Sequence, residues 1–101
     1  MGTGFRLVSS HKYVRLVNTK RLWLRIRQGH LQNVRFDDFQ RLLEEFGWAL
    51  DRQEGSHRVY RHPSVPERLS VQPDRNGQAK PYQIRDLRRY VEDYDLSQEE
   101  Q

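Results

Sequence analysis

Apolar residues recur at helical spacing in three segments of the chain, which predicts three helices. The first helix begins with Thr19 as its N-cap and ends at Gly29, with Leu22 and Ile26 one turn apart. It is short and basic. Residues 1–17 contain apolar positions without a steady period, and glycines and serines interrupt them, so this segment receives no assignment.

The segment from Phe36 to Trp48 has the clearest helical pattern. Asp37 is expected to cap this helix with Gln40 as its capping-box partner, and Gly47 is expected to end it. The apolar positions at helical spacing are Phe39, Leu42, Leu43 and Phe46.

A closing helix is predicted from Pro81, because proline suits the first helical turn. The segment from Gln72 to Lys80 before it is polar and rich in turn formers, which indicates a loop. The apolar stripe of the closing helix consists of Ile84, Leu87, Val91 and Tyr94.

Three strand-like segments lie between the helices, at Trp48 to Arg52, His57 to His62 and Arg68 to Gln72. Turn formers separate them, at Glu54-Gly55-Ser56 and at Pro63-Ser64-Val65-Pro66. Their order predicts an antiparallel meander, and two amphipathic helices are the economical cover for one face of it. The predicted fold class is therefore α+β, a three-stranded antiparallel sheet with two helices packed on one face, plus an extra N-terminal helix.

A chain of 101 residues with 35% hydrophobic content suits one compact domain and is too short for two. We expect that domain at residues 19–101, after an unassigned extension at 1–18. No run of about 18 apolar residues occurs, so neither a membrane span nor a signal peptide is expected, and we expect a cytoplasmic protein. The chain has no cysteine, which excludes disulfides and thiolate chemistry.

The charges are polarised along the chain, and the net charge is +4. No acidic residue occurs from Met1 to Phe36, and no basic residue follows Arg89. A basic balance of this size attracts phosphate backbones or anionic membranes, so it indicates a class of partner and does not indicate a fold. From composition alone, an ordinary solvated surface is the alternative.

Motifs for several kinds of chemistry are missing from the sequence. The four histidines form no metal-ligand spacing on the predicted helices, so neither a metal nor another cofactor is expected. No glycine-rich phosphate loop occurs, and Ser56 and Ser70 lack the context of an activated nucleophile.

His57 is the residue that carries candidate chemistry, because it lies where the Gly55-Ser56 turn meets a strand and arginines lie on or beside the predicted sheet. A neutral imidazole can take the proton from a ribose 2′-hydroxyl or return one to the leaving oxygen without a metal. The alternative is a structural strand histidine bonded to a main-chain carbonyl. Strand parity alone does not say which face is buried.

The stretch from Phe36 to Leu96 resembles the HicA family of bacterial toxin–antitoxin toxins, which are small mRNA-cleaving ribonucleases, or mRNA interferases. Four segments carry the resemblance by their order and spacing: Phe46-Gly47-Trp48, Arg52-Gln53-Glu54-Gly55-Ser56-His57, His62-Pro63, and the run from Gln72-Pro73-Asp74 through Lys80-Pro81-Tyr82-Gln83-Ile84.

The resemblance implies an α-β-β-β-α fold similar to a double-stranded RNA-binding domain, with its core at residues 36–96. It also implies that His57 is catalytic and that a HicB-type antitoxin covers it. Many members carry a second histidine directly after the first, whereas Arg58 stands there in this chain, which puts in doubt a role for a second imidazole. The helix from Thr19 to Gly29 resembles the extension of longer members.

Five basic residues are expected to bind RNA. Lys80 lies at the start of the last helix, where the helix dipole favours anions, and Arg75 lies in the loop before it. Arg85 lies on that helix away from the apolar stripe, and Arg58 and Arg61 follow His57 on its strand. A solvated helix face is the alternative for the helical positions.

Three functions remain open at this point. The first is a metal-independent endoribonuclease toxin that cleaves mRNA with His57 as general acid or base and is neutralised by its antitoxin. The second is a non-catalytic RNA-binding module of the same fold. The third is a domain that serves mainly as a protein partner.

Overall fold

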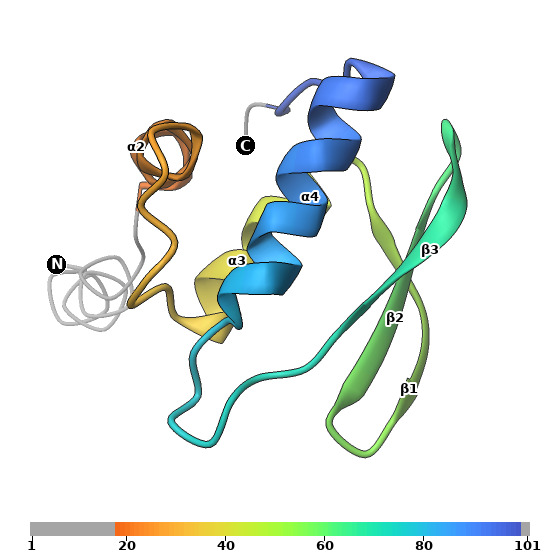
Figure 1. Cartoon of the computed structure of the whole chain (residues 1–101). Coiled ribbons are helices and arrows are strands. Elements are labelled where there is room, and N and C mark those ends of the chain that lie inside the picture. The colour runs from red at the N-terminus through yellow and green to blue at the C-terminus, as the bar shows by residue number, and fades with distance from the viewer. Residues whose placement is uncertain (1–17, 100–101) are drawn as a thin grey trace, which may run out of the picture.

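A computed structural model describes residues 18–99, and within them the chain forms three helices and one sheet (Figure 1). The predicted extension at 1–18 therefore lies outside the described residues, apart from Asn18. The elements in chain order are α2 (Thr19–Arg27), α3 (Phe36–Glu45), β1 (Ala49–Glu54), β2 (His57–His62), β3 (Val65–Val71) and α4 (Pro81–Tyr94).

The sheet has the order β1-β2-β3, and both neighbouring pairs are antiparallel, which confirms the predicted meander. Helices α3 and α4 lie together on one side of the sheet, and α2 lies on the far side of these two helices (Figure 1). The α+β fold with an additional N-terminal helix is thus confirmed. The shared core takes side chains from all three helices and from β2 and β3, including Ile26, Phe39, Leu42, Leu43, Tyr60, Leu69, Val71, Ile84 and Leu87.

One side chain decides which face of the sheet is buried. Tyr60 in β2 is only 2% exposed, and its neighbour across the strand pair, Leu69 in β3, is 3% exposed. Because side chains alternate along a strand, His57, Val59 and Arg61 must lie on the opposite, outer face. The burial pattern therefore places His57 on the solvent side of the sheet.

Both predicted caps differ from those observed. The N-cap of α2 is Asn18, whose side chain accepts hydrogen bonds from the backbone N–H groups of Lys20 and Arg21. In α3, Arg35 occupies the N-cap and makes no side-chain cap bond. The backbone N–H of Phe36 instead donates to the carbonyl of Gly77 at 3.0 Å, because the loop after β3 pairs with the start of α3. Asp37 is therefore a residue of the first turn and caps nothing.

The ends of three elements also differ from expectation. Helix α3 ends at Glu45, before the predicted limit at Trp48, and Gly47 follows with a φ of +94°. Strand β1 runs on to Glu54. Strand β3 begins at Val65 because only Pro63 and Ser64 form the turn that precedes it. The apolar side chain of Val65 is 4% exposed, so burial against the helices extends this strand beyond its predicted start at Arg68.

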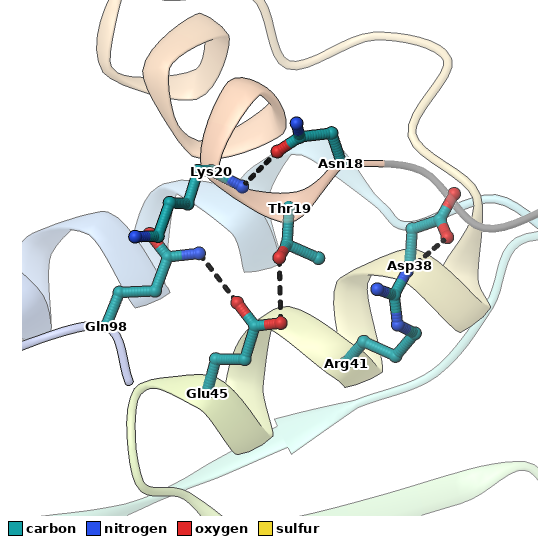
Figure 2. Close-up of polar contacts among 7 residues, drawn as sticks. All are labelled: Asn18, Thr19, Lys20, Asp38, Arg41, Glu45 and Gln98. Carbon is teal, nitrogen blue, oxygen red and sulfur yellow. Dashed lines mark hydrogen bonds and ion pairs between the residues drawn. The ribbon is translucent and has the colours of Figure 1, made fainter. Parts of the chain in front are cut away.

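A buried carboxylate joins α2 and the end of the described chain to α3 (Figure 2). Glu45 is 5% exposed, and its two carboxylate oxygens accept hydrogen bonds from the Thr19 hydroxyl and from the Gln98 side-chain amide, each at 2.7 Å. The backbone N–H of Glu99 donates to the Glu45 carbonyl, also at 2.7 Å. A buried charge is tolerated only with such donors. Thr19, predicted as a cap, thus has the different role of a donor to Glu45.

Candidate functional site

His57 lies beside Glu54 in an open hollow on the outer face of the sheet. The two residues are directly opposite each other where the β1–β2 hairpin closes. The hollow has a volume of about 290 Å³ and is lined by Arg52, Glu54, His57, Val59 and Ser70. We call it the hairpin hollow. The imidazole ring of His57 is reachable from solvent in this position, as proton transfer to or from an RNA substrate requires.

The local sequence explains why these side chains meet. Strands β1 and β2 are joined by the two-residue turn Gly55-Ser56, in which Gly55 has a φ of +61°, a conformation that L residues rarely adopt. The Gln53 side-chain amide donates to the Gly55 carbonyl at 3.1 Å, which supports the turn from outside. A two-residue turn makes its flanking residues cross-strand partners, so Glu54 and His57 face one another.

The arginines of the outer face are not equivalent. Arg61 and Arg68 both form ion pairs with Asp51, at 3.5 and 3.2 Å. Asp51 lies where the β1–β2 register shifts between Leu50 and Arg52. Arg52 lines the hairpin hollow and forms no ion pair within residues 18–99, so its charge is available to an anion beside His57.

Arg58 lies on the inner side of the sheet, away from His57. Its guanidinium is stacked over the Phe36 ring at 5.2 Å from the ring centroid, a cation–π contact. It lines a second hollow of about 540 Å³ together with residues of the α3 start and of the loop after β3: Arg35, Phe36, Asp37, Pro73, Asn76, Gly77 and Gln78.

The remaining predicted RNA contacts lie elsewhere. Arg75 is exposed in the loop after β3, Lys80 is the N-cap residue of α4, and Arg85 is exposed on α4 in a third hollow with Arg25 and His30. Of the five predicted basic residues, only Arg61 shares the face of His57, and it is paired with Asp51. The structure therefore distributes the predicted residues over several surfaces.

Sequence reasoning did not single out Arg52 and Glu54 as site residues. The signal that could have found them is the Gly55-Ser56 turn, because a two-residue hairpin connection fixes the pairing of Glu54 with His57. Arg52 then lies on the same face, two residues before Glu54.

The second histidine of β2 has a structural environment. The Nε2–H of His62 donates to the carbonyl of Phe46 at 2.8 Å, and its Nδ1 accepts from the backbone N–H of Ser64 at 3.0 Å. Its ring also packs edge-on against Trp48, with centroids 5.3 Å apart. His62 thus bridges the end of α3 and the β2–β3 turn, and both ring nitrogens are engaged.

Neither metal ligation nor a membrane span is indicated in the part of the chain that the structure describes. Residues 18–99 bring no three histidine, cysteine or acidic side chains together in a way that could hold a metal ion. No helix in this range combines the length and apolar character needed to cross a bilayer.

Comparison with known proteins identifies the family. The chain has no match among curated proteins or among solved structures. Residues 36–92, more than half of the chain, match the family described as HicA toxin of bacterial toxin-antitoxin. This segment runs from the start of α3 into α4 and contains the whole sheet with the hairpin hollow. The chain therefore belongs to the HicA family of toxins of bacterial toxin–antitoxin systems.

Proposed function

We propose that this toxin is a metal-independent endoribonuclease that cleaves mRNA in the hairpin hollow. Toxins of this family are generally ribonucleases. The observation that carries the proposal is the position of His57, exposed on the outer face of the sheet, opposite a carboxylate and beside an arginine.

The reaction needs one group to accept a proton and one to donate a proton. A base removes the proton from the ribose 2′-hydroxyl, and the oxygen attacks the adjacent phosphorus. The bond from phosphorus to the 5′-oxygen of the next nucleotide then breaks, and an acid protonates this leaving oxygen. The products are a 2′,3′-cyclic phosphate and a free 5′-hydroxyl. We assign the acid to His57 and the base to Glu54, its cross-strand partner.

Cations stabilise the charge that develops on the phosphorane oxygens. Arg52 is the arginine of the hairpin hollow that has no carboxylate partner among the described residues, and we assign this role to it. We propose that Arg61 acts on the same face by exchanging its Asp51 contact for a phosphate. Arg58, Arg75, Lys80 and Arg85 bind the RNA backbone away from the scissile bond.

A protein that neutralises this activity has to cover the hairpin hollow. We propose that a HicB-type antitoxin does so, because His57, Glu54 and Arg52 are all exposed and offer a surface of both charges. Binding over this hollow would exclude RNA from the acid, the base and the phosphate-binding arginine together.

The test of the proposed function is the chemistry of its products. We expect purified protein to cut a long unstructured RNA in the presence of EDTA and to leave 2′,3′-cyclic phosphate ends. These ends would identify the 2′-hydroxyl as the nucleophile, whereas a metal-activated water leaves other ends. RNA that is bound but never cut would overturn the proposal in favour of a non-catalytic RNA-binding module.

The alternative, a non-catalytic RNA-binding module, is favoured by one observation, the presence of Arg58 directly after His57. The inner position of Arg58 weakens this argument, because strand alternation directs residue 58 away from the hairpin hollow whichever side chain it carries. The side chains that line the hollow are therefore unaffected by this departure from the family pattern.

Replacing Glu54 with glutamine is expected to lower kcat by about 100-fold, because the amide cannot accept the 2′-hydroxyl proton. The pH–rate profile of the parent should be bell-shaped, and the variant should lose the limb on the acidic side. Glu44→Gln removes the same charge from an exposed position on α3 and should leave the profile unchanged. An unaltered profile for E54Q would show that Glu54 is not the base.

A further inference from the structure

A third hollow lies between α2, the loop that follows it, and the start of α4. Its volume is about 440 Å³, and three cationic or titratable side chains line it, Arg25 from α2, His30 from the loop and Arg85 from α4. The other lining residues are Gly29, Leu31, Gln32, Asn33 and Pro81, so no carboxylate contributes to its wall. We call it the α2–α4 hollow.

The arginines of this hollow differ from their neighbours on α4. Arg88 pairs with Glu92 at 3.3 Å, and Arg89 pairs with Asp86 at 3.4 Å. Arg25 and Arg85 form no ion pair with any residue of the described range. Two unpaired guanidinium groups in the wall of the α2–α4 hollow, with no carboxylate near them in that wall, produce a local positive potential. The planar guanidinium group also suits bidentate contacts to phosphate.

The fold holds this arrangement in place. The guanidinium of Arg88 donates to the carbonyl of Ile26 at 3.4 Å and so fastens α2 to α4. The loop leaves α2 through Gly29, with a φ of +95°, and turns again at Asn33, with a φ of +60°. The backbone N–H of His30 donates to the Arg25 carbonyl at 2.9 Å. The three side chains are therefore positioned by ordered backbone.

Two of these three side chains lie outside the segment by which the family is recognised. The family match covers residues 36–92, which include Arg85 but neither Arg25 nor His30. Helix α2 and the loop after it thus place Arg25 and His30 beside Arg85, a residue of the family segment. Helix α2 also lies on the opposite side of α3 and α4 from the sheet, as Figure 1 shows, so the α2–α4 hollow is separate from the hairpin hollow.

We propose that the α2–α4 hollow is a second binding site for the RNA backbone, in which Arg25 and Arg85 grip a phosphate and His30 adds a hydrogen bond. The inference rests on the proposed function only in taking RNA as the ligand. It assigns to α2 the role of holding the substrate at a distance from the scissile bond. Free phosphate offers the same chemistry, but a polymer gains from engaging two sites at once.

The test compares two double variants that lose the same charge. Both are made in the full chain with His57→Ala, so that bound RNA is not cut. Arg25→Ala with Arg85→Ala empties the hollow of its guanidinium groups. Arg21→Ala with Arg27→Ala removes two exposed arginines from α2 that do not line the hollow. Binding of a fluorescent single-stranded RNA is measured by anisotropy over a range of salt concentrations, with inorganic phosphate as competitor.

We expect R25A/R85A to weaken RNA binding by roughly tenfold and to make the slope of log K against log salt shallower by about 0.7, the contribution of one phosphate contact on a single strand. R21A/R27A should change the slope much less. Millimolar phosphate should fail to displace the RNA, which would identify the polymer as the ligand.

Several outcomes would overturn the inference without touching the proposed cleavage. Equal slopes for the two double variants would mean that only overall charge matters. Unchanged RNA binding by R25A/R85A, combined with loss of binding to the antitoxin, would assign the hollow to an acidic protein surface. Displacement by phosphate alone would mark an adventitious anion site. The kcat of R25A/R85A with His57 restored, measured at saturating RNA, reports separately on the hairpin hollow.

Discussion

Replacing His57 with alanine is expected to abolish RNA cleavage and growth arrest while leaving the protein folded. Loss of the general acid should lower the rate by about 10²- to 10⁴-fold. The side chain is exposed on the outer face of the sheet, so its removal leaves no cavity, and such surface substitutions change stability by about 0.5 kcal/mol or less. Cleavage of labelled RNA, growth after induction and thermal unfolding of the purified variant give the three readouts.

The matched control is the other histidine of β2. His62→Ala removes two hydrogen bonds and the contact with Trp48, so it should destabilise the fold by roughly 1–3 kcal/mol. Assayed well below its unfolding temperature, H62A should still cleave RNA. Rapid cleavage by H57A, or a complete loss of activity in folded H62A, would contradict the assignment of the two histidines.

Replacing Gly47 with alanine is expected to destabilise the protein by about 2–4 kcal/mol. The φ of +94° costs an L residue about 1–2 kcal/mol. The new Cβ would also lie 2.8 Å from Nε2 of His62, closer than real contacts allow. That ring is bonded on both sides, to Phe46 and to Ser64, and cannot move without breaking a hydrogen bond. Chemical denaturation measures the loss.

Gly29 supplies the control, because it has nearly the same φ of +95° and no atom within 4 Å of a built Cβ. Gly29→Ala should therefore show the backbone penalty alone. In a His62→Ala background, the additional penalty at Gly47 should disappear, so that G47A and G29A become equal. Equal effects of G47A and G29A in the parent protein would show that the contact with His62 carries no energy.

The fold was predictable where apolar residues recur at helical spacing or where a residue, such as proline, allows only one backbone conformation. Phe39, Leu42 and Leu43 revealed α3, and Pro81 marked the first turn of α4. The start of α3 was not predictable from local sequence, because the loop around Gly77 comes from a distant part of the chain and pairs with it. Local capping rules cannot anticipate such a tertiary partner. The cap of α2 lies only one position from the predicted one, because Asn18 suits that role as well as Thr19 does.

The candidate site was predictable only in part, for a similar reason. The tight turn before His57 identified the residue, whereas its exposure depended on the burial of Tyr60 on the other face, which alternation alone could not assign. Basic residues near one another in the sequence were expected to act together. Strand alternation directs Arg58 inward, and Arg61 forms an ion pair with Asp51. Basic residues that are neighbours in the sequence therefore do not gather around one site.

The Glu45 carboxylate connects the family segment to residues on both sides of it. Its donors come from Thr19 and Gln98, one on each side of the segment that matches the family. A protein trimmed to residues 36–92 would keep the carboxylate and lose both donors, together with the apolar cover that Leu22, Trp23 and Ile26 give to the helical layer. We therefore expect the cooperative folding unit of this toxin to be larger than the segment by which the family is recognised.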